Sequence, residues 1–424
     1  MGIMKMMQNI VILGAGFGGL RTAMKLGKKA KWLSRRGYQI ILVDKNPYHT
    51  YTPTLYEVAT TSKETANSLD LRRVTTYPIA ELLSGYNVQF LHDTVTNIDA
   101  RKAQIELGSG DSITYSHLVF ALGSKINYFG IDGMEQKALT LKTFTEALTI
   151  RDAIWEKIYA SKQKQEINIV ICGAGSTGVE LAAELQEWFY ELKKEGGKCN
   201  VKTTIIDAFP RILSKLDGQV IRKTEKRLKK LGVSILTDSL IEKVAGDKIT
   251  LRGDIRLRYD ILIWTGGIEA NSLIQTLPFK KSGRGVEVDK SLRAKLLNRH
   301  TKLKGEIYVI GDNAIFKNNR TRNIVPQLAR PAISEGSIAA ENIIRSISRK
   351  PKKDFHPIDY PCVVPVGGKY AIVKIGSIVI SGVLGWIAKG LIELSYLISI
   401  MPLKRAFKIW TDGLVIFMKN DRLG

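Results

Sequence analysis

The chain has 424 residues and 44% apolar content, so it is long enough for two or three domains and cannot be wholly disordered. Its net charge of +24 fits either solvated helix faces or contact with an anionic membrane surface. Nucleic acid is disfavoured as a partner, because no basic stripe with interleaved aromatic residues accompanies the charge. The three cysteines lack C-x-x-C spacing, which argues against a disulfide framework or a thiolate metal site. The first residues lead directly into an apolar strand, which leaves no room for a signal peptide, so we expect a cytosolic protein.

Two half-chains repeat one pattern. An apolar run at 9–13 precedes Gly14-Ala15-Gly16-Phe17-Gly18-Gly19 and a helical stretch, and a second run at 168–172 precedes Gly173-Ala174-Gly175-Ser176-Thr177-Gly178 and another helix. A short apolar run, a glycine loop and a helix are typical of the opening of a βαβ unit in a parallel sheet. The sequence therefore predicts two dinucleotide folds.

The repeat continues beyond the loops. Apolar runs at 40–44 and 204–207 each end in an acid, and the runs at 115–123 and 259–267 each end in glycine. A single unmatched strand at 307–312 then precedes a helix from about residue 331. This order predicts an α/β fold with two Rossmann-like domains, the second inserted into the first, followed by a distinct C-terminal region. The first domain is predicted to comprise residues 1–145 and 279–345, and the inserted second domain residues 146–278. The C-terminal region is predicted to be 346–424.

The glycine loops point to dinucleotide diphosphates. Glycine lets the backbone turn tightly and approach a pyrophosphate, which rests on the free N–H groups at the start of a helix. Asp44 and Asp207 stand where an acid accepts hydrogen bonds from a ribose 2′-hydroxyl, although the stretches between loop and acid are longer than usual because of basic insertions. A carboxylate at Asp207 favours NADH over NADPH, whereas the nearby Arg211 weakens that inference.

At this point the chain closely resembles the type II NADH:quinone oxidoreductases, a family of the two-dinucleotide-binding flavoprotein superfamily. The resemblance covers nearly the whole chain and is carried by four stretches: residues 51–59, reading YTPTLYEVA; Ala121-Leu122-Gly123-Ser124 with Asn127 and Phe129; Thr177-Gly178-Val179-Glu180-Leu181 with Glu184; and Pro210-Arg211-Ile212-Leu213.

The resemblance implies a division of roles. It implies an FAD site at Gly14, Gly16, Gly18, Gly19, Asp44, Lys45, Ala121, Gly123, Gly311, Asp312 and Ala329. It implies an NADH site at Gly173, Gly175, Ser176, Thr177, Gly178, Asp207 and Gly267. Glu180, Arg330, Ser334 and Lys369 are then the residues expected on the acceptor side, where electrons pass to a quinone without a metal and without proton pumping.

One stretch departs from the family pattern. The quinone site of the family usually carries an Ala-Gln pair with a second glutamine one helical turn later, whereas this chain has Arg330 after Ala329 and Ser334 at the second position. Both remain polar and four residues apart, on one helix face. Pro331 predicts that the helix begins only there.

Two other activities stay open. Flavin-dependent disulfide reductases are excluded by the lack of any cysteine before Cys172. A sulfide:quinone oxidoreductase needs two cysteines beside the flavin. In this chain only Cys362 is expected where it could reach a flavin, because Cys172 falls in a predicted buried strand and Cys199 follows a Lys-Glu-Gly-Gly loop. A non-catalytic, membrane-associated redox sensor is the alternative from another class.

The C-terminal region predicts attachment to one membrane leaflet. The longest uncharged run, 375–388, is too short to span a bilayer and contains glycines and serines, so part of it is expected as strand. After Pro402, an apolar helix face at Leu403, Phe407, Trp410, Leu414 and Phe417 has lysines and an arginine beside it. This pattern suits a helix at the cytoplasmic face of the cell membrane, on anionic lipid, while the alternative is packing on the protein's own core or on a second subunit of a homodimer.

Overall fold

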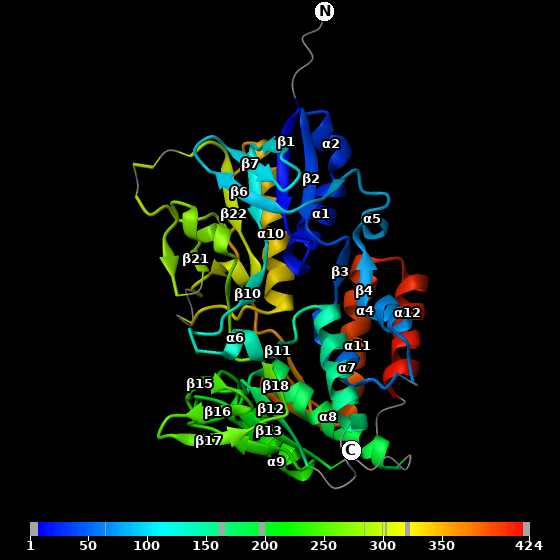
Figure 1. Cartoon of the computed structure of the whole chain (residues 1–424). Coiled ribbons are helices and arrows are strands. Elements are labelled where there is room, and N and C mark those ends of the chain that lie inside the picture. Colours follow the sequence, from blue (N-terminus) through cyan, green and yellow to red (C-terminus); the bar gives the residue numbers. More distant parts are fainter. Residues whose placement is uncertain are drawn as a thin grey trace, which may run out of the picture. The chain divides into compact units, whose positions relative to one another are not determined.

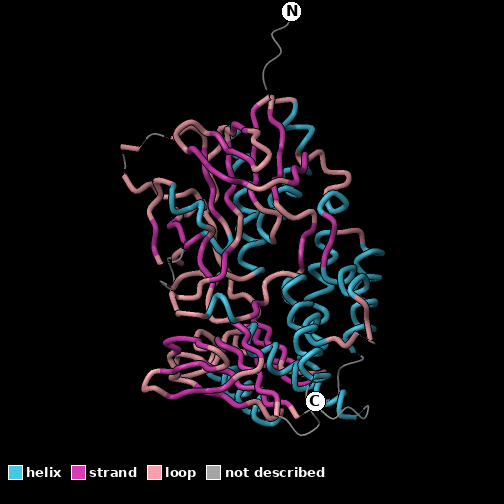
Figure 2. Tube along the Cα trace, in the orientation of Figure 1, coloured by secondary structure: helices cyan, strands magenta, loops and turns pink. Residues whose placement is uncertain are grey.

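The computed structural model describes residues 7–63, 65–160, 166–194, 200–283, 285–298, 300–301, 303–318 and 323–418 (Figures 1 and 2). These fold into two compact units. Unit 1 takes the chain up to His49, Tyr77–Ile126 and Ile268–Tyr360, and unit 2 takes Thr50–Thr76, Asn127–Gly267 and the chain from Pro361 onward. Each is described by itself.

Unit 1 is built on a parallel five-stranded sheet in the order β22-β9-β1-β2-β5. Its strands are β1 (Gln8–Leu13), β2 (Tyr38–Asp44), β5 (Gln89–His92), β9 (His117–Phe120) and β22 (Glu306–Val309). The central strands are near-continuous apolar runs, as expected for a sheet that is covered on both faces. Strand order reverses at β1, and a crevice at such a reversal is where open α/β sheets bind their ligands.

Helices α1 (Phe17–Gly27) and α10 (Ala329–Ile347) pack closely in unit 1. The Thr22 hydroxyl donates to the carbonyls of Gly18 and Gly336, at 2.9 and 3.1 Å, so the small residues of both helices meet backbone to backbone. The remaining elements of unit 1 are α2 (Ala30–Ser34), α5 (Ile79–Leu82), β6 (Val95–Asp99), β7 (Gln104–Leu107), β8 (Ser112–Thr114), β10 (Ser124–Ile126), β19 (Ile268–Ala270), η2 (Ser272–Thr276), β20 (Lys281–Ser282), β21 (Gly285–Glu287), η3 (Gly311–Asn313) and β23 (Ala314–Ile315).

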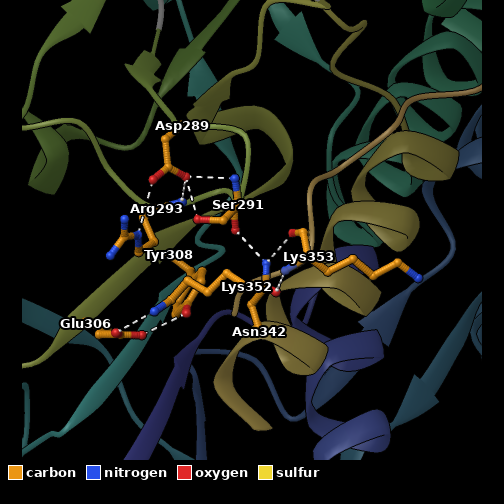
Figure 3. A network of polar contacts seen from close by, with 8 residues as sticks. All are labelled: Asp289, Ser291, Arg293, Glu306, Tyr308, Asn342, Lys352 and Lys353. Atoms are coloured by element: carbon orange, nitrogen blue, oxygen red, sulfur yellow. Dashed lines mark hydrogen bonds and ion pairs between the residues drawn. The ribbon is translucent and has the colours of Figure 1, made fainter. Parts of the chain in front are cut away.

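A polar network fastens the chain that leaves α10 (Figure 3). The buried Asn342 amide donates to the carbonyls of Ser291 and Lys353 and accepts from the Lys353 N–H at 2.7 Å. Lys352 Nζ lies 2.8 Å from Glu306, which also accepts from the Tyr308 hydroxyl. Residues 352–353 are thereby attached to β22 and to the 289–293 turn, and the chain continues from there into unit 2.

Unit 2 repeats the architecture. Its parallel sheet runs in the order β11-β18-β12-β13-β14, from β11 (Leu139–Thr140), β12 (Ile167–Cys172), β13 (Val201–Ile206), β14 (Ser234–Leu236) and β18 (Ile261–Trp264). Its other central elements are α6 (Met134–Lys137), α7 (Phe144–Ala160), α8 (Ser176–Lys194), α9 (Gly218–Lys230), β15 (Ile241–Ala245), β16 (Lys248–Leu251) and β17 (Ile255–Arg258). The glycine-loop strand is again central, so the predicted pair of Rossmann-like folds, one inserted in the other, is confirmed. The exact domain boundaries stay a prediction.

Residues 50–76 pack within unit 2, which the sequence pattern did not reveal. They form η1 (Thr52–Thr54), α3 (Leu55–Thr60) and α4 (Ser68–Thr75), and flanking them are β3 (Tyr48–Thr50) and β4 (Thr76–Pro78). Four apolar residues of α3 lie in one buried cluster with the strands and helices of the second dinucleotide fold: Leu55, Tyr56, Val58 and Ala59. The first long connection of unit 1 thus contributes to the core of unit 2.

The C-terminal region begins with an antiparallel sheet of β24 (Cys362–Pro365), β25 (Ala371–Ile375) and β26 (Ile378–Gly382). Helices α11 (Val383–Ile400) and α12 (Leu403–Phe417) follow. The prediction that part of 375–388 is strand is therefore confirmed, as is a helix after Pro402. The predicted apolar face of α12 is divided: Leu403 and Phe407 are exposed, whereas Trp410, Leu414 and Phe417 are half-buried against α11.

Candidate functional site

The first glycine loop lies between β1 and α1, and its glycines differ in what a side chain would meet. Gly14 has φ +94°, and a Cβ there would collide with the Ala121 carbonyl. A Cβ on Gly19 would collide with the Gly14 carbonyl, so this glycine allows the helix to start close to the strand. Around a Cβ on Gly16 there is nothing within 4 Å. That open side is where the backbone can meet a diphosphate.

The second loop repeats this geometry between β12 and α8. Gly173 has φ +115° and is packed against Gly266, while a Cβ on Gly178 would collide with the Gly173 carbonyl. Gly175, like Gly16, has nothing within 4 Å of a built Cβ. Ser176 and Thr177 begin α8, so their N–H groups belong to its unbonded first turn. Two loops of one design, each open at its middle glycine, fit two dinucleotides.

The acid after each second strand points back at its own loop. Asp44 Oδ2 accepts from the Ala15 N–H at 2.6 Å, and Asp207 Oδ2 accepts from the Ala174 N–H at 2.5 Å. The other oxygen of each accepts from the N–H two residues on, at Asn46 and Phe209. Asp207 lies one residue beyond β13 and not inside it. Each carboxylate retains lone pairs for a ribose, and it also orders the loop.

The returning strand β22 delivers Gly311 and Asp312 to unit 1. Asp312 accepts from the Ser124 hydroxyl at 2.7 Å, and the Gln327 amide donates to its carbonyl at 2.6 Å. The Gly311 N–H donates to Glu335 on α10 at 2.6 Å. Burial raises the pKa of Glu335 to about 8, against the opposing effect of this hydrogen bond. Ala121 and Gly123 follow β9, and the exposed Lys45 follows Asp44.

The structure corrects the predicted start of α10. The helix begins at Ala329, so Arg330 and Pro331 both lie in its first turn. Proline is tolerated there because the first N–H groups of a helix have no partner within the helix. Arg330 is exposed, and Ser334 is half-buried and hydrogen-bonded to Tyr360. Both residues belong to unit 1, and Ala329 is half-buried beside them.

Glu180 lies on α8 just beyond its first turn, two residues after Gly178 of the second loop, and is half-buried. Burial raises its pKa to about 8; the positive charge of Lys389 lowers it and the negative charge of Glu57 raises it. Glu180 therefore carries a proton at neutral pH. Burial also raises the pKa of Cys362, with Glu180 as the next cause.

Lys369 occupies the turn between β24 and β25, and a buried ion pair holds that turn. Arg227 Nη2 lies 3.2 Å from Glu187, which is fully buried, and the same guanidinium donates to the carbonyls of Val366 and Gly367. The Arg227 guanidinium also covers the Tyr370 ring at 4.8 Å. The turn that presents Lys369 is thus attached to α8 and α9 within unit 2.

An apolar cavity of about 130 Å³ lies in unit 2 between α11 and α12. Its polar wall is made of Glu57, Lys389 and Glu393, and its apolar wall includes Trp386, Ile387, Leu391, Trp410, Leu414 and Phe417. Burial raises the pKa of Glu393 to about 7, which Lys389 opposes and Glu57 reinforces. Sequence reasoning gave no role to Lys389 and Glu393, which follow the uncharged run 375–388 in an apolar stretch. The signal that could have found them is their spacing of one helical turn in an otherwise apolar helix.

Comparison with known proteins decides the family. The family model described as pyridine nucleotide-disulphide oxidoreductase matches residues 8–336. The chain belongs to this family. Its sequence is also 29% identical over 373 residues to the type II NADH:quinone oxidoreductase of Staphylococcus epidermidis, across 85% of this chain and 88% of that protein. The predicted resemblance is thereby confirmed.

Two solved structures share the fold of this chain. NDH2 from Plasmodium falciparum, solved in complex with NADH, has a TM-score of 0.81 and 18% identity, and the match covers 98% of this chain and 99% of that one. The sulfide:quinone oxidoreductase of Aquifex aeolicus has a TM-score of 0.73 and 19% identity, with coverage of 96% and 92%. At these identities the likeness speaks for the fold alone.

Proposed function

We propose that this chain is an FAD-dependent enzyme that transfers electrons from NADH to a membrane quinone, the activity by which its type II relatives are named. The observation that carries the proposal is the pair of glycine loops, each open at its middle glycine and each ordered by its own aspartate, one in each unit. Unit 1 would hold FAD through its loop, Asp44 and the Gly311-Asp312 turn. Unit 2 would hold NADH through its loop and Asp207.

FAD, when bound, supplies the two-electron redox chemistry, and the chain supplies orientation and protons. Oxidation of NADH by a quinone consumes one proton besides the hydride. Glu180 is protonated at neutral pH and is a suitable donor for that proton. Arg330, Ser334 and Lys369 keep the acceptor role that the family resemblance implies for each of them, and Arg330 is proposed to orient a quinone carbonyl. The apolar cavity between α11 and α12 offers a surface for the quinone's hydrocarbon part.

We place the C-terminal region on the cytoplasmic surface of the cell membrane. Exposed apolar residues form a stripe along α11 at Leu384, Ile387, Leu391 and Ile398 and continue on α12 at Leu403, Phe407 and Val415. Lys404 and Lys408 are exposed beside them and suit anionic headgroups. Helix α11 is long and apolar enough to cross a membrane by length and composition, at 18 residues. However, Lys389 and Glu393 on its other face cluster with Glu57 of α3, which favours a helix lying on the membrane.

The direct test is to reduce the purified protein with NADH and reoxidise it with a short-chain quinone in a stopped-flow instrument. We expect bound FAD, rapid loss of flavin absorbance with NADH, and recovery with quinone. Gly16→Leu should abolish flavin retention, whereas Gly175→Leu should keep flavin but lose reduction by NADH, because each side chain would fill only one loop's open side. Wild-type protein without flavin, or flavin that NADH does not reduce, would refute the proposal.

Sulfide oxidation is the second candidate, favoured by the shared fold and by Cys362. Cys172 argues against it, because this cysteine is fully buried in β12 and cannot act beside Cys362 of β24, which is half-buried. Cys199 lies outside the described residues. Flavin reduction by sulfide in the absence of NADH would favour this activity. A redox sensor would bind both cofactors but would not turn over with quinone.

A further inference from the structure

We infer that His49 is a positioning residue for the first glycine loop: its imidazole fixes the Ala15 peptide on which the diphosphate of the unit 1 dinucleotide would rest. This inference rests on the proposed FAD site. His49 is only 1% exposed, and its Nδ1 lies 2.8 Å from the Ala15 carbonyl oxygen. The ring meets the Phe17 ring edge-on, with centroids 5.2 Å apart, and stacks on Tyr77 at 6.4 Å. These contacts set the ring's orientation.

The hydrogen bond defines the proton position on the ring. A carbonyl oxygen only accepts, so Nδ1 must carry the hydrogen. Burial lowers the pKa of His49 to about 4, so the ring is neutral at physiological pH with one N–H, which this contact uses.

Both backbone groups of Ala15, its N–H and its carbonyl, are therefore hydrogen-bonded to side chains. Asp44 accepts the Ala15 N–H at 2.6 Å, and His49 donates to the Ala15 carbonyl at 2.8 Å. A helix N-terminus binds an anion only if its free N–H groups face the anion and the carbonyls point away. Holding the carbonyl at Ala15 prevents the peptide that follows it from turning its oxygen toward a bound phosphate.

The second loop provides an internal comparison. Ala174 corresponds to Ala15, and Asp207 accepts its N–H at 2.5 Å. Its carbonyl is held at 2.8 Å by the backbone N–H of Leu213, a residue with φ +49°. The same carbonyl is thus fixed by a side chain in unit 1 and by the main chain in unit 2. A change at position 49 should consequently weaken one dinucleotide site and leave the other unchanged.

The test compares flavin release from holoenzyme variants. His49→Phe keeps a buried ring but removes the donor, and should release FAD about fivefold to tenfold faster, the effect expected of one hydrogen bond. His49→Asn places an amide donor near the former Nδ1 and should restore most of the retention. Affinity for NAD⁺, which binds without reducing the flavin, should stay within about twofold of wild type in both.

A matched control separates positioning from general loss of stability. His117→Phe changes another buried histidine of unit 1, which lies on β9 and contacts the Ser116 hydroxyl at 3.0 Å instead of the loop. It should leave the flavin release rate unchanged even where it lowers the thermal midpoint. Wild-type release from His49→Phe, or equal acceleration in His117→Phe, would overturn the inference. A wild-type protein that binds no FAD would instead refute the proposed function. Should His49→Phe not fold, failure of His49→Asn to retain flavin better than His49→Ala would count against the inference equally.

Discussion

Lys389 of α11 donates a hydrogen bond of 2.6 Å to Glu57 of α3, so a largely buried ion pair joins the C-terminal region to the segment that follows the first dinucleotide motif. The two side chains are 14% and 11% exposed. Glu57 Oε1 also accepts from the Tyr56 hydroxyl, and Oε2 is buried without a hydrogen-bond partner within the described chain. Lys389 forms an ion pair with Glu57, and its positive charge also lowers the pKa of Glu180 and of Glu393. One cation therefore interacts with three carboxyl groups.

Removing that cation should be costly. Lys389→Met leaves Glu57 uncompensated in an apolar environment, and we expect a loss of about 3 kcal/mol in the free energy of unfolding, measured with urea. Glu57→Gln with Lys389→Met should recover most of it. Arg73→Met, which breaks the exposed pair with Asp412, is the matched control and should cost less than about 1 kcal/mol. If Lys389→Met and the double variant have equal stability, Glu57 and Lys389 are not energetically coupled.

The pH dependence of quinone reduction should follow Glu180. Its pKa is raised from 4.5 to about 8, so the folded state holds a proton that the unfolded state releases between these values. The associated stability is fully present below pH 4.5 and is lost as the pH rises through about 8. We expect flavin reoxidation by quinone to slow as the pH rises through about 8 and to lose this dependence in Glu180→Gln. Arg330→Ala should slow the same half-reaction. If either variant slows only reduction by NADH, its assignment to the acceptor side is wrong.

Acid should release flavin before it releases nicotinamide. The pKa of His49 falls from 6.5 to about 4 on folding because of burial. The contribution of His49 to the free energy of unfolding is therefore fully present above pH 6.5 and is lost as the pH falls through about 4. This pKa shift corresponds to a change on the order of 3 kcal/mol in the free energy of unfolding. Flavin fluorescence should report release below about pH 5, while NAD⁺ affinity falls less over the same range. Burial lowers the pKa of His117 in the same direction, so the experiment is repeated in His117→Phe. Unchanged flavin retention down to pH 4 would contradict this prediction.

Cofactor preference should depend on the charge of Asp207, but the choice of variant matters. Because Asp207 also accepts the Ala174 N–H, Asp207→Ala should weaken NADH binding as well as narrow the preference over NADPH. Asp207→Asn keeps an acceptor and removes the charge, so it should narrow the preference with a smaller loss of affinity. The measurement is kcat/KM for both cofactors. Arg211 lies 3.9 Å from Glu225, and Arg211→Ala is the control. Equal efficiency with both cofactors in the wild type would show that Asp207 does not discriminate.

Membrane binding should be removable without disturbing the core. Truncation before Gly376 would expose unit 2, since Tyr396, Leu397 and Ile400 are buried, so point variants are the sharper test. Leu403 and Phe407 are 65% and 54% exposed, and changing both to serine should weaken sedimentation with anionic liposomes by at least about tenfold. NADH-dependent reduction of a soluble dye should be retained.

Leu297→Ser is the control for this experiment, because Leu297 is 73% exposed but belongs to unit 1. It should leave liposome binding unchanged. Liposome binding that is unaffected by the Leu403 and Phe407 changes, with an altered oligomeric state, would instead assign this face to a homodimer.

The sequence by itself determined the local chemistry. The glycine spacing, the apolar strands and the terminal acids at Asp44 and Asp207 act over short distances along the chain, and the sterics of a tight turn allow few alternatives to glycine at Gly14 or Gly173. The repeat was therefore readable, as was the mixture of strand and helix before and after Gly382.

Only the tertiary structure decided which distant groups share an environment. The placement of α3 in unit 2, the pairing of Glu57 with Lys389 and the contact of His49 with Ala15 depend on long-range packing. A histidine in a strand or a lysine in an apolar helix carries no local signal of its partner. Their protonation and roles arise from burial, which is a property of the folded core and not of neighbouring residues in the chain.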